Sequence, residues 1–378
     1  MGGNWEWAPH MDAGLWGWAG YNLGMAMQAL LQQLVEMTPL DRGQARAAFD
    51  AVMDGQAGPE QTAALLALLA VRDVAVPELI GAAEAMRARV TPVAVPAGLT
   101  PIDIVGTGGD HSGTFNISTA AALVVAGAGR EQGVCVAKHG NRAVTSRSGS
   151  SQALEALGVG LTADPATLTR CLEAAGICFC FAPHHHPAMK HAAPVRKALG
   201  FRTVFNLVGP LTNPAGVQRL LLGVFSRAMV KPMAEALQGL GVDRAMVVHG
   251  QIPAADGSHI DGFDELSTCG PTQVASVSPA GIERSVVDPT ELGLPYSHPA
   301  ALRVESPQQS AEVILRVLSG DAGPAEEVVL LNAAGGLVIA GLAGGLEEGL
   351  ELARRSIGDG LAMAALEALR GVTPGGGG

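Results

Sequence analysis

The sequence is poor in charged residues, and basic residues are the scarcer kind. Only 16% of the 378 residues are Asp, Glu, Lys or Arg, and 24 basic residues stand against 35 acidic ones, a formal net charge of −11. So little charge beside 48% hydrophobic residues excludes an intrinsically disordered chain. The acidic balance argues against nucleic acid as the main partner, because such binding depends on a basic surface.

Cysteines are few, and no Lys or Arg precedes Arg42. The chain has five cysteines, an odd number without the spacing of a disulfide framework, which favours reduced thiols. They are Cys135, Cys171, Cys178, Cys180 and Cys269. The absence of Lys and Arg before Arg42 leaves no positive start for a secretory signal. We therefore expect a cytoplasmic protein.

One long uncharged stretch, residues 328–346, has the length of a membrane span. It contains Asn332 and two Gly-Gly pairs, and no second such stretch accompanies it. We interpret it as a buried core helix and expect no membrane partner.

The order of the sequence patterns predicts two domains, which the length also favours. Residues 25–90 have helical periodicity, residues 91–101 form a proline-rich linker, and strand and helix patterns alternate afterwards. The predicted strands are residues 102–105, 134–137, 177–181, 220–225 and 245–248. This alternation predicts an α/β fold class, with a small all-α N-terminal domain plus a larger α/β domain with a mostly parallel central sheet.

The domain boundaries follow from the same patterns. Residues 1–24 contain all four tryptophans among glycines without a clear period, so we expect a disordered leader. The small α-helical domain takes residues 25–95, with helices from about 187–205 as a candidate addition, and the α/β domain takes residues 100–372. Within the small domain, residues 38–41 are predicted to start a helix with Pro39 as its first residue, and Gly58 and Pro59 to start the next.

The most informative motif is the glycine-rich run 106–110 (GTGGD), directly after the predicted strand 102–105. Glycine has no Cβ, so backbone N–H groups there can approach an anion closely. Ser118 or Thr119 is predicted to cap the helix that follows, with its open end facing the loop. Together these parts predict a phosphate site, although a purely structural turn is an equal alternative.

Two further clusters bear charges suited to a phosphorylated ligand. Residues 138–150 contain Lys138, Arg142 and several hydroxyl groups at the end of the predicted strand 134–137, where open α/β sheets bind ligands. The alternative for this cluster is a solvated polar loop. Asp264 and Glu265 are adjacent carboxylates that can both reach Mg²⁺, although acidic residues also begin helices without binding any ligand.

The histidine run 184–186 and Arg196 carry weaker signals. The three histidines are consecutive and have no further ligands at metal-binding spacing, so we do not predict a metal site there. Arg196 is a candidate clamp for a carboxylate, because a guanidinium can bind both oxygens at once. A lone arginine is more often part of a surface ion pair.

In this order and at these separations, the clusters resemble the anthranilate phosphoribosyltransferase family of tryptophan biosynthesis, from about residue 27 to 370. The matching pieces are GTGGD, FNIST, KHGNRAVTSRSGS, FAPHHHPAMKHAAPVRKALGFRTVFNLVGPLTNPA and DGFDELS. The resemblance implies a nucleoside phosphorylase/phosphoribosyltransferase-type fold and a homodimer formed through the small domains. It also implies transfer of the phosphoribosyl group of phosphoribosyl pyrophosphate to the amine of anthranilate.

The resemblance further implies the site residues, position by position. Phosphoribosyl pyrophosphate is expected to bind Gly106, Gly109, Asp110, Thr114, Asn116, Ser118, Thr119, Lys138, His139, Gly140, Asn141, Arg142, Ala143, Val144, Thr145, Ser146 and Ser150. Anthranilate is expected at Gly106, Asn141 and Arg196, with Arg196 facing its carboxylate. Two magnesium ions are expected at Ser118, Asp264 and Glu265. No residue is assigned as an essential general base, because ionisation of the ribose C1–O bond is expected to drive the reaction.

The sequence departs from the family pattern in the leader, at residues 129–133 and at residues 251–260, an insertion just before the acidic pair. Two alternatives stay open: a pyrimidine nucleoside phosphorylase of the same fold, and a non-catalytic relative that binds nucleic acid. The KHGN and APVR segments disfavour the first, and the net charge of −11 disfavours the second.

Overall fold

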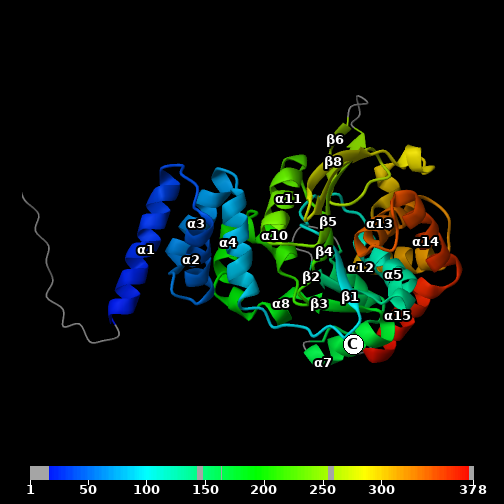
Figure 1. The fold of residues 1–378 in the computed structure, drawn as a ribbon, viewed down its shortest axis with the longest axis horizontal. Helices are drawn as coiled ribbons and strands as arrows, with labels where there is room; N and C mark the ends of the chain where they lie inside the picture. Colours follow the sequence, from blue (N-terminus) through cyan, green and yellow to red (C-terminus); the bar gives the residue numbers. More distant parts are fainter. Residues whose placement is uncertain (1–16, 143–147, 163, 254–258, 374–378) are drawn as a thin grey trace, which may run out of the picture.

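A small helical domain and a larger α/β domain lie side by side (Figure 1). The computed structural model describes the chain except for residues 1–16, 143–147, 163, 254–258 and 374–378. The small domain contains α1 (Gly17–Val35), α2 (Arg42–Met53), α3 (Pro59–Val71) and α4 (Val76–Arg87). Helix α1 begins inside the segment predicted as a leader, of which residues 1–16 lie outside the described part of the chain.

Polar side chains define where the helices of the small domain begin. The Asp41 carboxylate accepts a hydrogen bond from the Gln44 N–H, and the Asp41 N–H donates to the Gln44 side chain. Asp41 is therefore the N-cap of α2, and the prediction of Pro39 as the first helical residue was wrong, because the side chain that reaches the free N–H groups is that of Asp41. The predicted start of α3 at Gly58 and Pro59 is confirmed.

A mostly parallel sheet forms the centre of the larger domain, so the predicted fold class is confirmed. Its strands are β1 (Thr100–Gly106), β2 (Val134–Gly140), β3 (Ile177–Phe181), β4 (Arg219–Gly223), β5 (Arg244–Pro253), β6 (His259–Phe263), β7 (Thr272–Ser278) and β8 (Gly281–Val287). They lie in the order β3-β2-β1-β4-β5-β7-β8, with β6 also paired to β5. Strands β1 to β5 pair in parallel and β6 to β8 antiparallel. The antiparallel strands were not predicted, and β8 is an exposed edge strand without apolar alternation.

The sheet separates two hydrophobic cores. Successive side chains of a strand point to opposite faces, so Leu221 of β4 packs in one core while Leu220 and Leu222 pack in the other. The first core is covered by helices of the larger domain. They are α5 (Ile117–Gly129), α6 (Ser150–Ala156), α7 (Pro165–Ala175), α12 (Pro307–Leu318), α13 (Pro324–Ala340), α14 (Leu346–Gly358) and α15 (Leu361–Val372).

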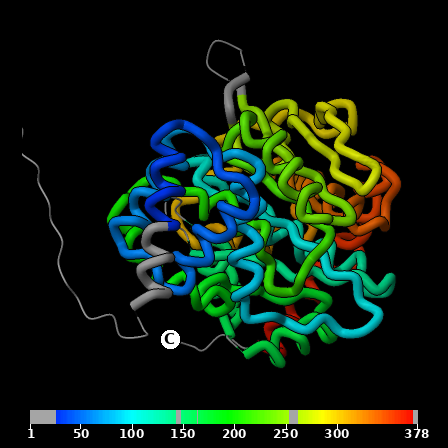
Figure 2. The backbone as a smooth tube through the Cα atoms, turned by 60° about the vertical axis from the view of Figure 1, so that its left-hand side comes forward, coloured from blue at the N-terminus to red at the C-terminus, as the bar shows by residue number. Residues whose placement is uncertain are grey.

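The second core is shared with the small domain. It contains residues of α2 to α4 together with residues of α9 (Ala193–Leu199), α10 (Val204–Val208) and α11 (Val230–Gly239). Helix α9 packs against α3, and α10 packs against α3 and α4. Strand β3 is followed by α8 (Ala182–His185), and then by α9 and α10. These segments lie beside the helices of the small domain, drawn in blue, in both the ribbon and the tube view (Figures 1 and 2). The chain therefore returns to the small domain after forming three of the eight strands, β1 to β3.

Helix α13 is the buried core helix predicted from the uncharged stretch. It packs on β1, β4 and β5, and nearly all of its residues from Val328 onward are buried. In the described part of the chain, none of the helices combines the length and the apolarity that a membrane span needs. The buried Asn332 of α13 accepts a hydrogen bond from the Leu266 N–H at 3.0 Å and donates to the Leu266 carbonyl at 2.8 Å. This side chain ties the acidic segment 264–265 to the core.

Replacing Asn332 by leucine should therefore destabilise the protein. Asn332→Leu leaves the buried N–H and C=O of Leu266 without partners, and we expect the free energy of unfolding to fall by about 2–4 kcal/mol. The exposed Gln308→Leu on α12 makes the same amide-to-leucine change without that loss and should stay within about 0.5 kcal/mol. Urea denaturation measures both, and equal stability of the two variants would contradict the role given to Asn332.

Candidate active site

The sequence-predicted clusters meet at the carboxyl ends of the parallel strands. Gly106, Gly140 and Gly223 are the last residues of β1, β2 and β4, which are neighbours in the sheet. The glycine loop 106–110 and the basic segment 138–150 thus leave adjacent strands at the same edge. Open α/β sheets bind their ligands at this edge.

The glycines of the loop are required by its shape. Gly108 and Gly109 have φ of 68° and 79°, in the left-handed region that side chains disfavour. Gly106 and Gly223 are required for another reason, because a Cβ on either would collide with Asp264. The end of β4 therefore packs directly against the Asp264 backbone, and the Asp264 carboxyl group lies directly on Gly106 of the loop.

Two amide groups predicted to face an anion are bonded to carboxylates. The Gly108 N–H donates to Asp264 Oδ2 at 2.7 Å, and the Ser118 N–H donates to Glu265 Oε1 at 3.2 Å. Helix α5 begins at Ile117, so the prediction that Ser118 or Thr119 caps it was wrong. The position before the helix belongs to Asn116, whose side chain makes no capping bond, and Glu265 supplies the negative charge that a helix N-terminus favours.

Lys138 is the cation at the centre of the site. It is buried in β2, and its Nζ donates to the Ile104 carbonyl at 2.7 Å and to Ser118 Oγ at 3.0 Å. Burial lowers the pKa of Lys138, while Asp103, Glu265 and Asp264 oppose this in that order. Its positive charge is thus held between β1 and the start of α5, next to both acidic residues.

The carboxylates are crowded. Burial, and next the charge of Asp110, raise the pKa of Asp264 to about 8. Burial and the neighbouring Asp264 raise the pKa of Glu265 as well. No group of three or more His, Cys, Asp or Glu in the described ranges could hold a metal ion unaided. Asp264 and Glu265 therefore suit a hard cation that takes its remaining ligands from water or a bound substrate.

The buried side chain of Asp103 forms a hydrogen-bond network beneath this site, which was not predicted from the sequence. Asp103 accepts hydrogen bonds from the His139 N–H at 3.2 Å and from Asn213 Nδ2 at 2.7 Å, and Asn213 also bonds the Ala137 carbonyl. Burial raises the pKa of Asp103 to about 6. Asp103 stands in the predicted strand before the glycine loop, and a charged residue inside an apolar strand is the signal that could have found it.

A second group of missed residues surrounds Asn116. Its Oδ1 accepts hydrogen bonds from Ser148 Oγ at 2.6 Å and Ser310 Oγ at 2.8 Å, and its N–H bonds Ser310 Oγ at 3.0 Å. Asn116 therefore ties α5 to the basic segment and to α12. Ser148 lies within the predicted cluster, whereas nothing local in the sequence singles out Ser310.

The basic segment lies partly outside the described residues. Ala143, Val144, Thr145 and Ser146, all predicted ligand contacts, are not described. His139 is buried, and its Nε2 lies 3.2 Å from Nε2 of His186. The predicted contacts that follow β2 are placed as follows: Gly140 ends the strand, Asn141 and Arg142 are exposed, and Ser150 Oγ bonds the Asn141 carbonyl.

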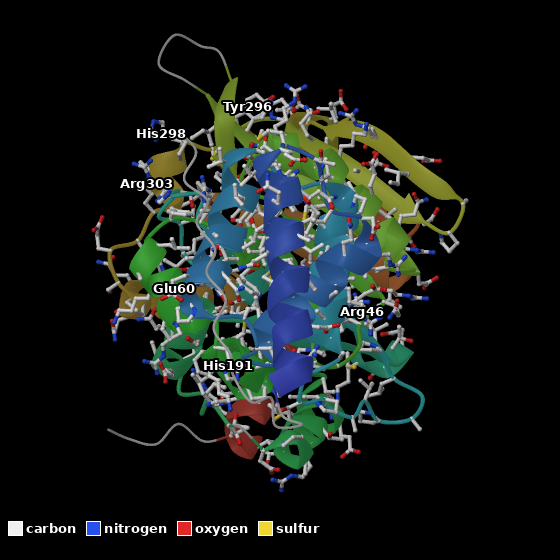
Figure 3. All side chains as sticks on the ribbon, turned by 90° about the vertical axis from the view of Figure 1, so that its left-hand side faces the viewer. Arg46, Glu60, His191, Tyr296, His298 and Arg303 are labelled. Atoms are coloured by element: carbon white, nitrogen blue, oxygen red, sulfur yellow. The ribbon has the colours of Figure 1, made fainter. Side chains whose placement is uncertain are left out.

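The remaining predicted contacts have different surroundings. Thr114 pairs with Arg303, and its Oγ1 lies 3.2 Å from Ser112 Oγ. Thr119 is buried, and its hydroxyl has no hydrogen-bond partner. Gly109 and Asp110 are partly exposed on the loop. Arg303 is labelled at the upper left of the molecule in Figure 3.

Arg196 stands apart from this network, on α9 at the small-domain side. Its guanidinium lies 5.2 Å from the centre of the Phe205 ring, and burial lowers its pKa. It forms no ion pair with any residue that the structure describes. A half-buried arginine on an aromatic ring, without a carboxylate partner, remains available to an anionic ligand.

The insertion predicted at residues 251–260 belongs to a hairpin. Strand β5 extends to Pro253 and pairs antiparallel with β6, which ends at Phe263, directly before the acidic pair. Residues 254–258 lie outside the described part of the chain. The insertion thus lengthens two paired strands, and Asp264 and Glu265 still reach the glycine loop.

Family models match both domains. Residues 99–363 match the a/b domain of a glycosyl transferase family, and residues 28–90 match the helical bundle domain of a glycosyl transferase family.

Relatives match over nearly the whole chain. Anthranilate phosphoribosyltransferase of Rubrobacter xylanophilus is 48% identical over 342 residues, which are 90% of this chain and 96% of the relative. The crystal structure of anthranilate phosphoribosyltransferase from Thermus thermophilus is 41% identical, with a TM-score of 0.81 over 91% of this chain and 98% of that one. The Saccharomyces cerevisiae enzyme in complex with PRPP and Mg is 26% identical, with a TM-score of 0.79 over 92% and 98%.

The raised pKa of Asp264 predicts a stability that falls with rising pH. An unfolded aspartate has a pKa of about 4, whereas folded Asp264 has a pKa of about 8. Between these values the folded state binds the extra proton, so its stability decreases as the pH rises. In EDTA, we expect the free energy of unfolding to drop by about 1.5 kcal/mol from about pH 6.5 to about pH 8.

That pH window separates Asp264 from the shifted histidines and from Asp103, whereas Glu265, whose pKa is also raised by burial and by Asp264, adds to the same decline. Burial lowers the pKa of His139 to about 3 and of His186 to about 4, which lowers stability only below about pH 6.5. Above its folded pKa of about 6, Asp103 contributes little to the change of the free energy of unfolding with pH. Asp264→Asn should therefore flatten the decline, and the exposed Asp359→Asn should leave it unchanged. A wild-type stability that rises across the window would show that the direction is wrong.

Proposed function

The chain belongs to the anthranilate phosphoribosyltransferase family, and we propose that it transfers the phosphoribosyl group of phosphoribosyl pyrophosphate to the amine of anthranilate. The products are N-(5-phosphoribosyl)anthranilate and pyrophosphate, and the reaction is a step of tryptophan biosynthesis. The observation that carries the proposal is the convergence of the glycine loop, Lys138 and the acidic pair at one edge of the sheet. These are the groups that a sugar diphosphate held by a divalent cation needs.

Phosphoribosyl pyrophosphate binds the glycine loop, the start of α5 and the segment that follows β2. The Gly108 N–H of the loop and the Ser118 N–H at the start of α5 suit phosphate oxygens, because both point into the site and the dipole of α5 adds positive potential. In the structure these two amides bond Asp264 and Glu265. Binding of the diphosphate therefore replaces carboxyl oxygens by phosphate oxygens as the acceptors of these two N–H groups.

Magnesium fits the donors present. Ser118, Asp264 and Glu265 offer oxygen atoms, which Mg²⁺ prefers. Burial raises the pKa of both acids, with the charge of Asp110 next for Asp264 and that of Asp264 next for Glu265, and a bound cation would offset this cost. The related yeast enzyme has been solved with PRPP and Mg. We propose two ions per active site, which neutralise the diphosphate as it leaves.

Anthranilate binds from the small-domain side, with its carboxylate on Arg196. Gly106 and Asn141 complete its site, so the amine is presented to the ribose held by the larger domain. An aromatic amine is a weak nucleophile, and the C1–O bond therefore breaks early, with positive charge on the sugar as in glycoside hydrolysis. Lys138 stabilises the departing diphosphate, and the fixed loop holds the sugar in position. No essential general base is required.

The transfer can be measured directly. Purified protein with phosphoribosyl pyrophosphate, MgCl₂ and anthranilate should consume anthranilate, seen as loss of its fluorescence, and EDTA should stop the reaction. Glu265→Gln should retain folding and lose most of the activity at saturating Mg²⁺. Phosphorolysis of a pyrimidine nucleoside in the absence of any transfer to anthranilate would overturn the proposal.

Arg196→Gln should weaken anthranilate binding selectively. Loss of a charge-assisted contact to the carboxylate costs roughly 1.5–3 kcal/mol, or about 10- to 100-fold in KM for anthranilate. We expect KM for phosphoribosyl pyrophosphate to change less than about threefold. The neighbouring Lys197→Gln, exposed on the same helix, is the matched control and should leave both constants near the wild-type values. An equal rise in both KM values would contradict the role assigned to Arg196.

We propose a cytoplasmic homodimer formed through the small domains. All five cysteines are free and buried, as suits a reducing compartment. Three large apolar side chains of the small domain are exposed: Val35 by 58%, Met37 by 62% and Val71 by 84%. They lie at the ends of α1 and α3, and α1 covers the face of the small domain seen in Figure 3. Such a surface suits a second copy of the chain.

Charges placed on this surface should separate the dimer. Val35→Asp combined with Val71→Asp should shift the sedimentation coefficient from that of a dimer to that of a monomer. The control is Val286→Asp on the exposed edge strand β8, which should remain dimeric. A monomeric wild-type protein at micromolar concentration would rule out this proposal.

A further inference from the structure

Arg202 lies against the glycine loop, although no prediction included it. Its Nη1 donates a hydrogen bond to the Gly109 carbonyl at 3.0 Å, and its guanidinium lies 4.1 Å from the centre of the Phe225 ring. A Cβ on Gly109 would lie 3.3 Å from Arg202 Cδ, so the side chain covers the loop closely. No ion pair with a described residue competes for the guanidinium.

Phe225, the platform for Arg202, is itself bonded to the loop. The Phe225 N–H donates to Thr107 Oγ1 at 3.1 Å, and the Thr107 N–H donates to the Gly223 carbonyl at 3.0 Å. The glycine loop is thus held from β4 on one side and from Arg202 on the other. Stacking on an aromatic ring restricts the guanidinium, which makes its hydrogen bond to Gly109 directional.

Arg202 reaches the loop from the small-domain side. It lies between α9 and α10, and both helices pack against α3 or α4. The left-handed glycines of the loop lose more backbone entropy on ordering than other residues would. A restraint on Gly109 therefore lowers the cost of presenting the loop amides to a ligand.

The geometry points to Arg202 as a positioning residue that holds the glycine loop ready for phosphoribosyl pyrophosphate, with Phe225 as its support. This inference rests on the proposed function of the loop. Arg202 acts through the Gly109 carbonyl and the Phe225 ring. It links the small domain, which carries the anthranilate side of the site, to the loop that binds the diphosphate. Removal of the guanidinium leaves the contact of Thr107 with β4 in place but removes the restraint on Gly109.

The test measures binding and kinetics separately. By isothermal titration calorimetry with MgCl₂, we expect Arg202→Gln to bind phosphoribosyl pyrophosphate about tenfold more weakly, the factor that loss of one hydrogen bond from a charged group gives. KM for anthranilate should stay within about twofold, and the melting temperature should hardly change, because Arg202 is exposed. Arg227→Gln, which removes an exposed arginine two residues after Phe225, should bind like the wild type.

Two further variants distinguish positioning from charge alone. Arg202→Lys keeps the charge but loses the planar group, and should remain about fivefold or more weaker than the wild type. Phe225→Leu should weaken binding, and adding Arg202→Gln to it should have little further effect, because the two act as a unit. Full affinity in Arg202→Lys or Arg202→Gln would overturn the inference. Because binding is read without turnover, an inactive wild type would instead overturn the proposed function.

Discussion

The site depends on a close approach between backbone amides and carboxylates at one sheet edge. Asp264 and Glu265 lie against the Gly108 and Ser118 N–H groups, and Lys138 supplies the only positive charge built into the strands at this point of the described structure. Burial, and then the neighbouring acidic charges, raise the pKa of each acid. The same amides, lysine and carboxyl groups suit a diphosphate and its cation. Asp264 and Glu265 occupy the N–H groups proposed for the phosphates and so keep these groups close together.

The two faces of the sheet support this arrangement through different parts of the chain. The first core, with α5 and α13, is internal to the larger domain, and Asn332 fastens the acidic segment to it. The second core is shared with the small domain through α9 to α11. The chain therefore brings Arg202 to the glycine loop from the side of the small domain and places Arg196 on that same side, although both follow three of the eight strands in sequence.

Much of the fold follows from local pattern, and the errors have local causes too. Strand and helix alternation predicts the parallel strands because each must bury an apolar run. The start of α2 was misplaced because Pro39 resembles a first helical residue, whereas Asp41 is the side chain that bonds the backbone. The start of α5 was misplaced because serine and threonine often cap helices, whereas Glu265 serves that end from far along the chain. Strands β7 and β8 were missed because β8 is exposed and lacks alternation.

The class of fold, the glycine loop and the charged residues could all be predicted from local pattern, because they depend on residues close together in the chain. The amides that the acids contact, the buried side chains beneath the site and the restraint of Gly109 by Arg202 became visible only once the chain was folded. Asp103 with Asn213, Asn116 with Ser310 and Arg202 with Gly109 are each separated by about ninety residues or more. Such pairs meet because strands and helices pack, and no local pattern encodes the distance between them.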